Sequence, residues 1–153
     1  FGILDAKIHT TKDGYALDTF LVTEPAFASN YRDIINLIEH ELTDVLAKQA
    51  PLTTPNQGRL SRMSRNFPLV PTVELRPDDK GQYFLLSISA NDKNGLLYSV
   101  ANLLAKYKIN LHTAKIMTLG ERVEDVFLVD GPALHNPKNQ IQFESELLDA
   151  LRI

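Results

Sequence analysis

The chain has 153 residues, of which 44% are hydrophobic and 23% charged, with seven glycines and eight prolines. This composition is typical of a folded domain and excludes collagen-like, low-complexity and wholly disordered chains. A formal net charge of −3 provides no basic field for nucleic acid, and the absence of cysteine excludes disulfides, thiolate metal sites and thiol nucleophiles. No apolar run approaches the roughly 20 residues of a membrane span, so we expect a cytoplasmic protein that binds neither nucleic acid nor membrane. Because periodic sequence begins almost at Phe1, which is not a methionine, we also expect a piece of a longer chain.

The first third of the chain predicts a hairpin followed by a helix. Residues 3–10 alternate between apolar and polar side chains, which is typical of a half-buried strand. Asp13-Gly14 predicts a tight turn into a second strand over 16–22. Ser29 or Asn30 caps the helix that we expect to run to Lys48. Apolar residues recur along this helix at helical spacing, so we expect it to lie on a sheet.

A linker is predicted over residues 49–69. Its first ten residues are rich in proline and small polar side chains, which favour a loop. Arg59, Arg62 and Arg65 follow at a spacing of three, close to one helical face. These arginines either dock on a partner domain or form a solvated turn of the linker.

The remaining residues, 70–153, predict a complete α+β unit. We expect strands over 70–75 and 83–90, a helix over 95–107 and strands over 111–119 and 123–129. Asn136-Pro137 caps the last predicted helix, over 137–151. From the second strand onward this order is that of a ferredoxin-like β-α-β-β-α-β fold without its last strand. Residues 70–75 fill that edge position, antiparallel to the strand over 83–90.

An internal repeat relates the two parts of the chain. Residues 6–10 and 114–118 share Ala-Lys-Ile-x-Thr, and residues 18–22 and 125–129 share Asp-x-Phe-Leu-Val. Both pairs of motifs come in the same order and precede a proline and an amphipathic helix, which predicts two copies of one structural unit. Residues 1–48 are then the rear half of the first copy, whose front half we expect upstream of Phe1.

A family resemblance enters at the segment Asp92-Lys93-Asn94-Gly95-Leu96-Leu97, which leads from a predicted strand into a helix. It resembles the corresponding turn of the ACT family of amino-acid-sensing domains, which usually has Arg-Pro where Lys93-Asn94 stand. Residues 110–130 and 4–20 are similar to the successive C-terminal ACT repeats of the bifunctional PII uridylyltransferase/uridylyl-removing enzymes.

This resemblance implies a cytoplasmic bacterial nitrogen sensor with ferredoxin-like ACT repeats, L-glutamine as its allosteric ligand and the PII signal protein as the partner of the whole enzyme. It also implies Mg²⁺-dependent nucleotidyltransferase and hydrolase domains elsewhere in that enzyme. No residue pattern of either catalytic domain is found in this chain, and its four histidines are scattered without metal-ligand spacing. We therefore expect a regulatory fragment with no catalytic residue, metal or cofactor of its own.

The candidate ligand-binding residues are those of the strand-to-helix turn (Asp92, Lys93, Asn94, Gly95, Leu96 and Leu97), together with Asn110 and His112. A helix N-terminus presents unpaired N–H groups to an α-carboxylate, Gly95 permits close approach, and Asp92 offers an acidic cap to an α-ammonium group. Asn110 and His112 begin a strand that, in paired ACT repeats, faces the turn of the other repeat. The alternatives are structural: Asp92 only caps the helix, Asn110 is a helix C-cap, and His112 is a surface-strand histidine.

Two functions of different classes follow. The first is a glutamine-responsive regulatory module whose ligand shifts a larger enzyme between uridylyl transfer and uridylyl removal. The second is a structural module that binds no small molecule and pairs by a strand edge with a second chain or with the catalytic domains. In either case we expect the fragment to self-associate, because half a repeat leaves apolar faces uncovered.

Overall fold

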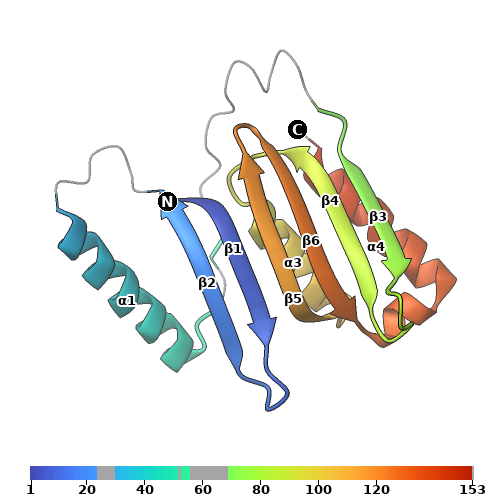
Figure 1. The fold of residues 1–153 in the computed structure, drawn as a ribbon, viewed down its shortest axis with the longest axis horizontal. Coiled ribbons are helices and arrows are strands. Elements are labelled where there is room, and N and C mark those ends of the chain that lie inside the picture. Colours follow the sequence, from blue (N-terminus) through green and yellow to red (C-terminus); the bar gives the residue numbers. More distant parts are fainter. Residues whose placement is uncertain (24–29, 52, 56–68, 153) are drawn as a thin grey trace.

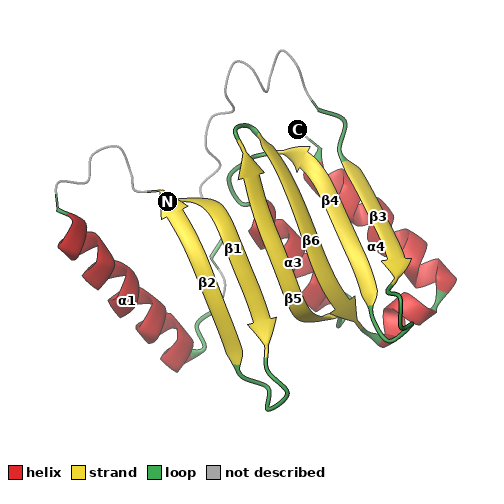
Figure 2. Cartoon of the chain, viewed as in Figure 1, coloured by secondary structure: helices red, strands yellow, loops and turns green. Residues whose placement is uncertain are grey.

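The computed structural model describes residues 1–23, 30–51, 53–55 and 69–152. Within them lie six strands, three α-helices and one short 3₁₀ helix (Figures 1 and 2). In chain order these elements are β1 (Gly2–Thr10), β2 (Ala16–Thr23), α1 (Tyr31–Lys48), β3 (Thr72–Pro77), β4 (Phe84–Asn91), α3 (Leu96–Lys106), β5 (Asn110–Leu119), β6 (Arg122–Asp130), η1 (Pro132–His135) and α4 (Pro137–Leu151). The predicted caps Asn30 and Asn136 are confirmed, because each side chain accepts hydrogen bonds from the first turn of its helix.

The strands form one sheet in the order β2-β1-β5-β6-β4-β3, and all neighbouring strands are antiparallel. Helices α3 and α4 pack on one face, over β3 to β6 (Figure 1). Inward side chains of these strands and both helices make up the core. The predicted α+β, ferredoxin-like class is confirmed, and β3 lies at the edge beside β4, as expected for a last strand moved to the front.

The two copies of the repeat meet at the centre of the sheet, where β1 pairs with β5. Lys7 lies opposite Lys115, its own counterpart in the repeat, and Ala6 and Ile8 lie opposite Ile116 and Ala114. The pairing therefore has a local pseudo-twofold axis at the two lysines. A repeat motif that pairs with its own copy in this way forms an isologous junction within one chain.

Two further features obey the same symmetry. Thr118 donates its hydroxyl proton to the carbonyl oxygen of Ile3 at 2.9 Å, and Thr10 donates to the equivalent carbonyl of Leu111 at 3.1 Å. The register shifts of the two hairpins also fall at equivalent places, one residue after Ile3 and one after Leu111. The threonine that ends each Ala-Lys-Ile-x-Thr motif therefore joins the two repeats.

The surroundings of the first repeat differ from those of the second. Phe127 is 3% exposed beneath the helices, whereas its counterpart Phe20 is 48% exposed, and every residue of β2 is exposed. Our expectation that α1 lies on a sheet is wrong: α1 has no buried residue and stands beside the outer edge of β2 (Figure 1). Its counterpart α4 packs against α3 and β3, and the described residues contain no equivalents of these elements for α1.

Candidate functional site

A cavity of about 620 Å³ lies at the junction of the two repeats, at the end of the sheet where β4 leads into α3. Its walls come from both repeats: residues 1–3 at the start of β1, and residues 92–98 of the β4–α3 turn and the first turn of α3. Thr53 and Pro55 of the predicted linker add a further wall, and side chains of β5 and β6 complete it. All six candidate residues of the turn, Asp92 to Leu97, therefore line one cavity.

The turn is shaped by Gly95, which has a φ of +80° and is the N-cap residue of α3. This left-handed conformation favours glycine, because other L-residues place their Cβ too close to the following carbonyl oxygen. A Cβ at this position would also lie 2.7 Å from Cγ of Pro55. Gly95 therefore permits both the turn and the close approach of the linker.

Two backbone N–H groups in the first turn of α3 have no backbone carbonyl acceptor among the described residues. Leu96 donates its N–H to the carbonyl of Lys93, but among the described residues no backbone carbonyl accepts from Leu97 or Tyr98. Because α3 has 11 residues, its N-terminus carries the partial positive charge of an ordinary helix. This end of the cavity suits a carboxylate.

Asp92 and Lys93 have other roles than capping. The N-cap residue of α3 is Gly95 and no side chain caps the helix, so the alternative that Asp92 only caps it is wrong. Partial burial raises the pKa of Asp92 above its usual value, although the N–H of Lys93 counteracts this. The Lys93 ammonium group donates to the carbonyls of Ala150 and Arg152 at the end of α4, and burial lowers its pKa. Lys93 thus fastens α4 to the turn.

Asp125 is a site residue that the sequence analysis missed. It is 1% exposed on β6 and lines the cavity. Its Oδ1 accepts the N–H of Met117 at 3.1 Å, whereas its Oδ2 is buried without a hydrogen-bond partner among the described residues. Burial and the nearby charge of Asp92 raise the pKa of Asp125 to about 6, against the effect of the Met117 N–H. The signal was present, because Asp125 alternates in phase with Val123 and Phe127 on the apolar side of the strand.

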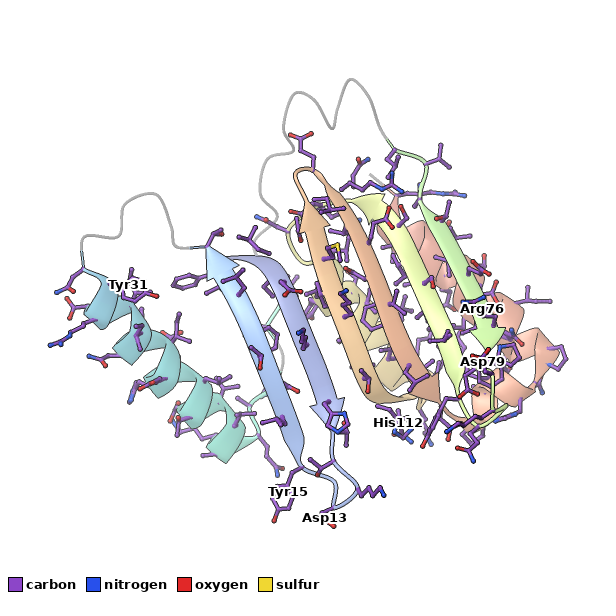
Figure 3. All side chains as sticks on the ribbon, in the orientation of Figure 1. Asp13, Tyr15, Tyr31, Arg76, Asp79 and His112 are labelled. Carbon is purple, nitrogen blue, oxygen red and sulfur yellow. The ribbon has the colours of Figure 1, made fainter. Side chains whose placement is uncertain are left out.

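Asn110 and His112 do not reach this cavity. They lie at the start of β5, at the opposite end of the sheet from the β4–α3 turn; Figure 3 shows His112 at the end occupied by Asp79 of the β3–β4 turn. Asn110 is an exposed first residue of β5 rather than a helix C-cap, since the left-handed residue after α3 is Lys108. The His112 ring packs 4.4 Å from that of Tyr83, and its Nε2 is buried without a partner in the part of the chain described.

By the pseudo-twofold symmetry, Asn110 is the counterpart of Gly2, which does line the cavity. Leu4, the counterpart of His112, does not line the cavity. The described residues contain no β4–α3 turn of the first repeat, so the predicted role of Asn110 and His112 beside such a turn stays a prediction.

Other kinds of site find little support among the described residues. They contain no group of three His, Asp or Glu side chains that could hold a metal ion. In the same residues, no helix is long and apolar enough to cross a membrane. Arg59, Arg62 and Arg65 lie outside the described residues.

Comparison with known proteins finds relatives that share one name and are 58–62% identical to this chain. The chain is 60% identical over 154 aligned residues to the "Bifunctional uridylyltransferase/uridylyl-removing enzyme" of Cupriavidus metallidurans, and 62% identical over 157 to that of Cupriavidus pinatubonensis. It is 58% identical over 156 residues to the protein of the same name in Ralstonia nicotianae. The predicted similarity to the bifunctional uridylyltransferase/uridylyl-removing enzymes is confirmed.

The alignment with these bifunctional uridylyltransferase/uridylyl-removing enzymes covers 99–100% of this chain. In each case the chain spans only 18% of the length of the curated relative. No protein-family model matches the chain, and no solved structure does. The similarity therefore concerns one region of a much longer enzyme.

Proposed function

We propose that this chain is the glutamine-sensing ACT region of a cytoplasmic bifunctional uridylyltransferase/uridylyl-removing enzyme, which uridylylates and deuridylylates the PII signal protein. Similarity to enzymes of that name over the whole length of this chain supports the assignment. The cavity between the repeats carries the sensing role, because it combines free helix N–H groups with acidic side chains in a space large enough for an amino acid. In this proposal the catalytic domains, with their Mg²⁺, lie elsewhere in the enzyme.

The position of the cavity explains how a ligand acts at a distance. Its walls belong to β1 of the first repeat and to the β4–α3 turn of the second, so a bound ligand touches both. A ligand that binds one arrangement of the repeats better than another shifts the population toward it. A coupling free energy of about 1–3 kcal/mol corresponds to a change of roughly 5- to 150-fold.

Calorimetric titration of the intact protein with L-glutamine tests this proposal, with D-glutamine and L-glutamate as controls. Saturable binding of L-glutamine that is lost in Gly95→Val supports the assignment. An absence of heat up to millimolar L-glutamine contradicts it.

The structural alternative is favoured by a separate observation. All eight residues of β2 are exposed, its outer edge has no partner strand in the described residues, and α1 buries no side chain. An open strand edge of this kind is a template for pairing with another chain or domain. We propose that the isolated fragment self-associates through this edge. Sedimentation velocity tests this: we expect a dimer or larger species, and a monomer at every concentration contradicts it.

A further inference from the structure

The unpaired oxygen of Asp125 calls for a physical explanation. Asp125 is 1% exposed, yet one of its two carboxylate oxygens has no hydrogen-bond partner among the described residues. Burying an unpaired carboxylate oxygen is costly, and native proteins keep few such groups. The repeat offers a comparison, because its counterpart Asp18 is exposed on β2. No described helix covers β2, so the elements packed on β6, and not the motif alone, bury Asp125.

Among the described residues, no cationic side chain pairs with Asp125. Asp92 is close enough that its charge raises the pKa of Asp125. The Lys93 ammonium is bonded to the carbonyls at the end of α4. Lys93 also lines the cavity, but in the part of the chain described no hydrogen bond or ion pair joins it to Asp125. Two aspartate side chains thus line one cavity, and the charge of each disfavours the ionised form of the other unless a cationic group lies between them.

We propose that Asp125 binds the ammonium group of a free α-amino acid whose α-carboxylate lies at the N-terminal turn of α3. This assignment rests on the proposed amino-acid-sensing function of the cavity and adds the residue that selects the ligand. The ligand class is an α-amino acid with a free primary ammonium group. Compounds that lack this group leave the Asp125 oxygen unpaired and are rejected, because removing one partner of a buried charged group is costly.

Proton linkage follows from this assignment. An ammonium group beside Asp125 stabilises the ionised carboxylate, so the ligand competes with a proton for the same oxygen. The pKa of Asp125 in the empty cavity is about 6. Affinity should therefore be nearly constant above pH 7 and fall about tenfold by pH 5.

The test is calorimetric titration of the intact protein with L-glutamine at pH 5, 6 and 7.5, comparing the wild type with Asp125→Asn and with the matched control Asp18→Asn. We expect Asp125→Asn to bind at least about tenfold more weakly at pH 7.5 and to lose the pH dependence. Asp18→Asn should behave as the wild type does. Wild-type affinity and pH dependence in Asp125→Asn overturn the inference and leave the proposed function standing.

A second measurement does not depend on the folding of a variant. Glutaramic acid, which is glutamine without its α-amino group, is titrated into the wild-type protein at pH 7.5. We expect binding at least about tenfold weaker than that of L-glutamine. Equal affinity overturns the role of Asp125. Failure of the wild type to bind L-glutamine at millimolar concentration overturns the proposed function itself, and the inference with it.

Discussion

Replacing Asp125 by asparagine should stabilise the fold at neutral pH. Burial raises the pKa of Asp125 to about 6 in the folded protein, compared with about 3.9 in an unfolded chain. The folded state therefore holds this proton more tightly than the unfolded state. The contribution of Asp125 to stability is most favourable below pH 4 and is lost as the pH rises through 6.

The magnitude follows from the difference between the two pKa values. A difference of about 2 pH units corresponds to roughly 3 kcal/mol between the protonation states. Asparagine keeps an oxygen that can accept the N–H of Met117 and carries no charge to bury. We expect Asp125→Asn to raise the free energy of unfolding by about 1–3 kcal/mol at pH 7, with no gain near pH 4.

Urea denaturation of the 153-residue chain between pH 4 and 7.5, followed by far-ultraviolet circular dichroism, measures this effect. Asp18→Asn is the matched control, because Asp18 is exposed and its replacement should change the unfolding free energy little at any pH. If Asp125→Asn were less stable than the wild type by the same amount at every pH, the carboxylate would have a stabilising partner and the reasoning would be refuted. Higher stability together with weaker ligand binding is typical of a functional residue.

Three further predictions test the architecture of the site. Gly95→Val should strain the backbone of the turn and weaken L-glutamine binding, measured by calorimetry, at least about tenfold. Gly120→Val is the control, because Gly120 also has a positive φ but lies in open space, and it should not weaken binding. Equal effects of the two substitutions would contradict a role for the turn. Thr10→Val and Thr118→Val should each lower the urea-unfolding free energy by about 1 kcal/mol, and unequal losses would argue against reciprocal junction bonds. Lys93→Met should lower the free energy of unfolding by about 1–2 kcal/mol. An unchanged midpoint of urea denaturation would show that the hydrogen bonds of Lys93 to the end of α4 contribute nothing to stability.

Much of the fold could be predicted because local and repeat signals agree. Alternation in the strands, apolar spacing in the helices and the caps Asn30 and Asn136 each depend on a few neighbouring residues. The repeat added long-range information: Ala6 pairs with Phe20 and Ala114 with Phe127, so one motif predicts the same hairpin twice. The strand-to-helix turn was located by its glycine and its resemblance, and all its residues line the cavity.

The errors share one cause, which is the absence of information on tertiary partners. The apolar spacing of α1 predicts a buried face, but burial needs a counterpart of α3 or β3, and none is present in the part of the chain that the structure describes. The expectation that Asn110 and His112 face the turn of the other repeat stays a prediction, because the described residues contain no such turn. The roles of Lys93 and Asp125 depend on which atoms lie opposite them, and spacing along the chain does not contain that information.

The central claim is that the junction between the two repeats receives an amino acid. Hydrogen–deuterium exchange of the intact protein with and without saturating L-glutamine tests this claim most directly. We predict slower exchange in peptides covering residues 92–98 and 1–5, with no change in those covering α1. Glutamine binding that protects other segments and leaves both of these unchanged would contradict it.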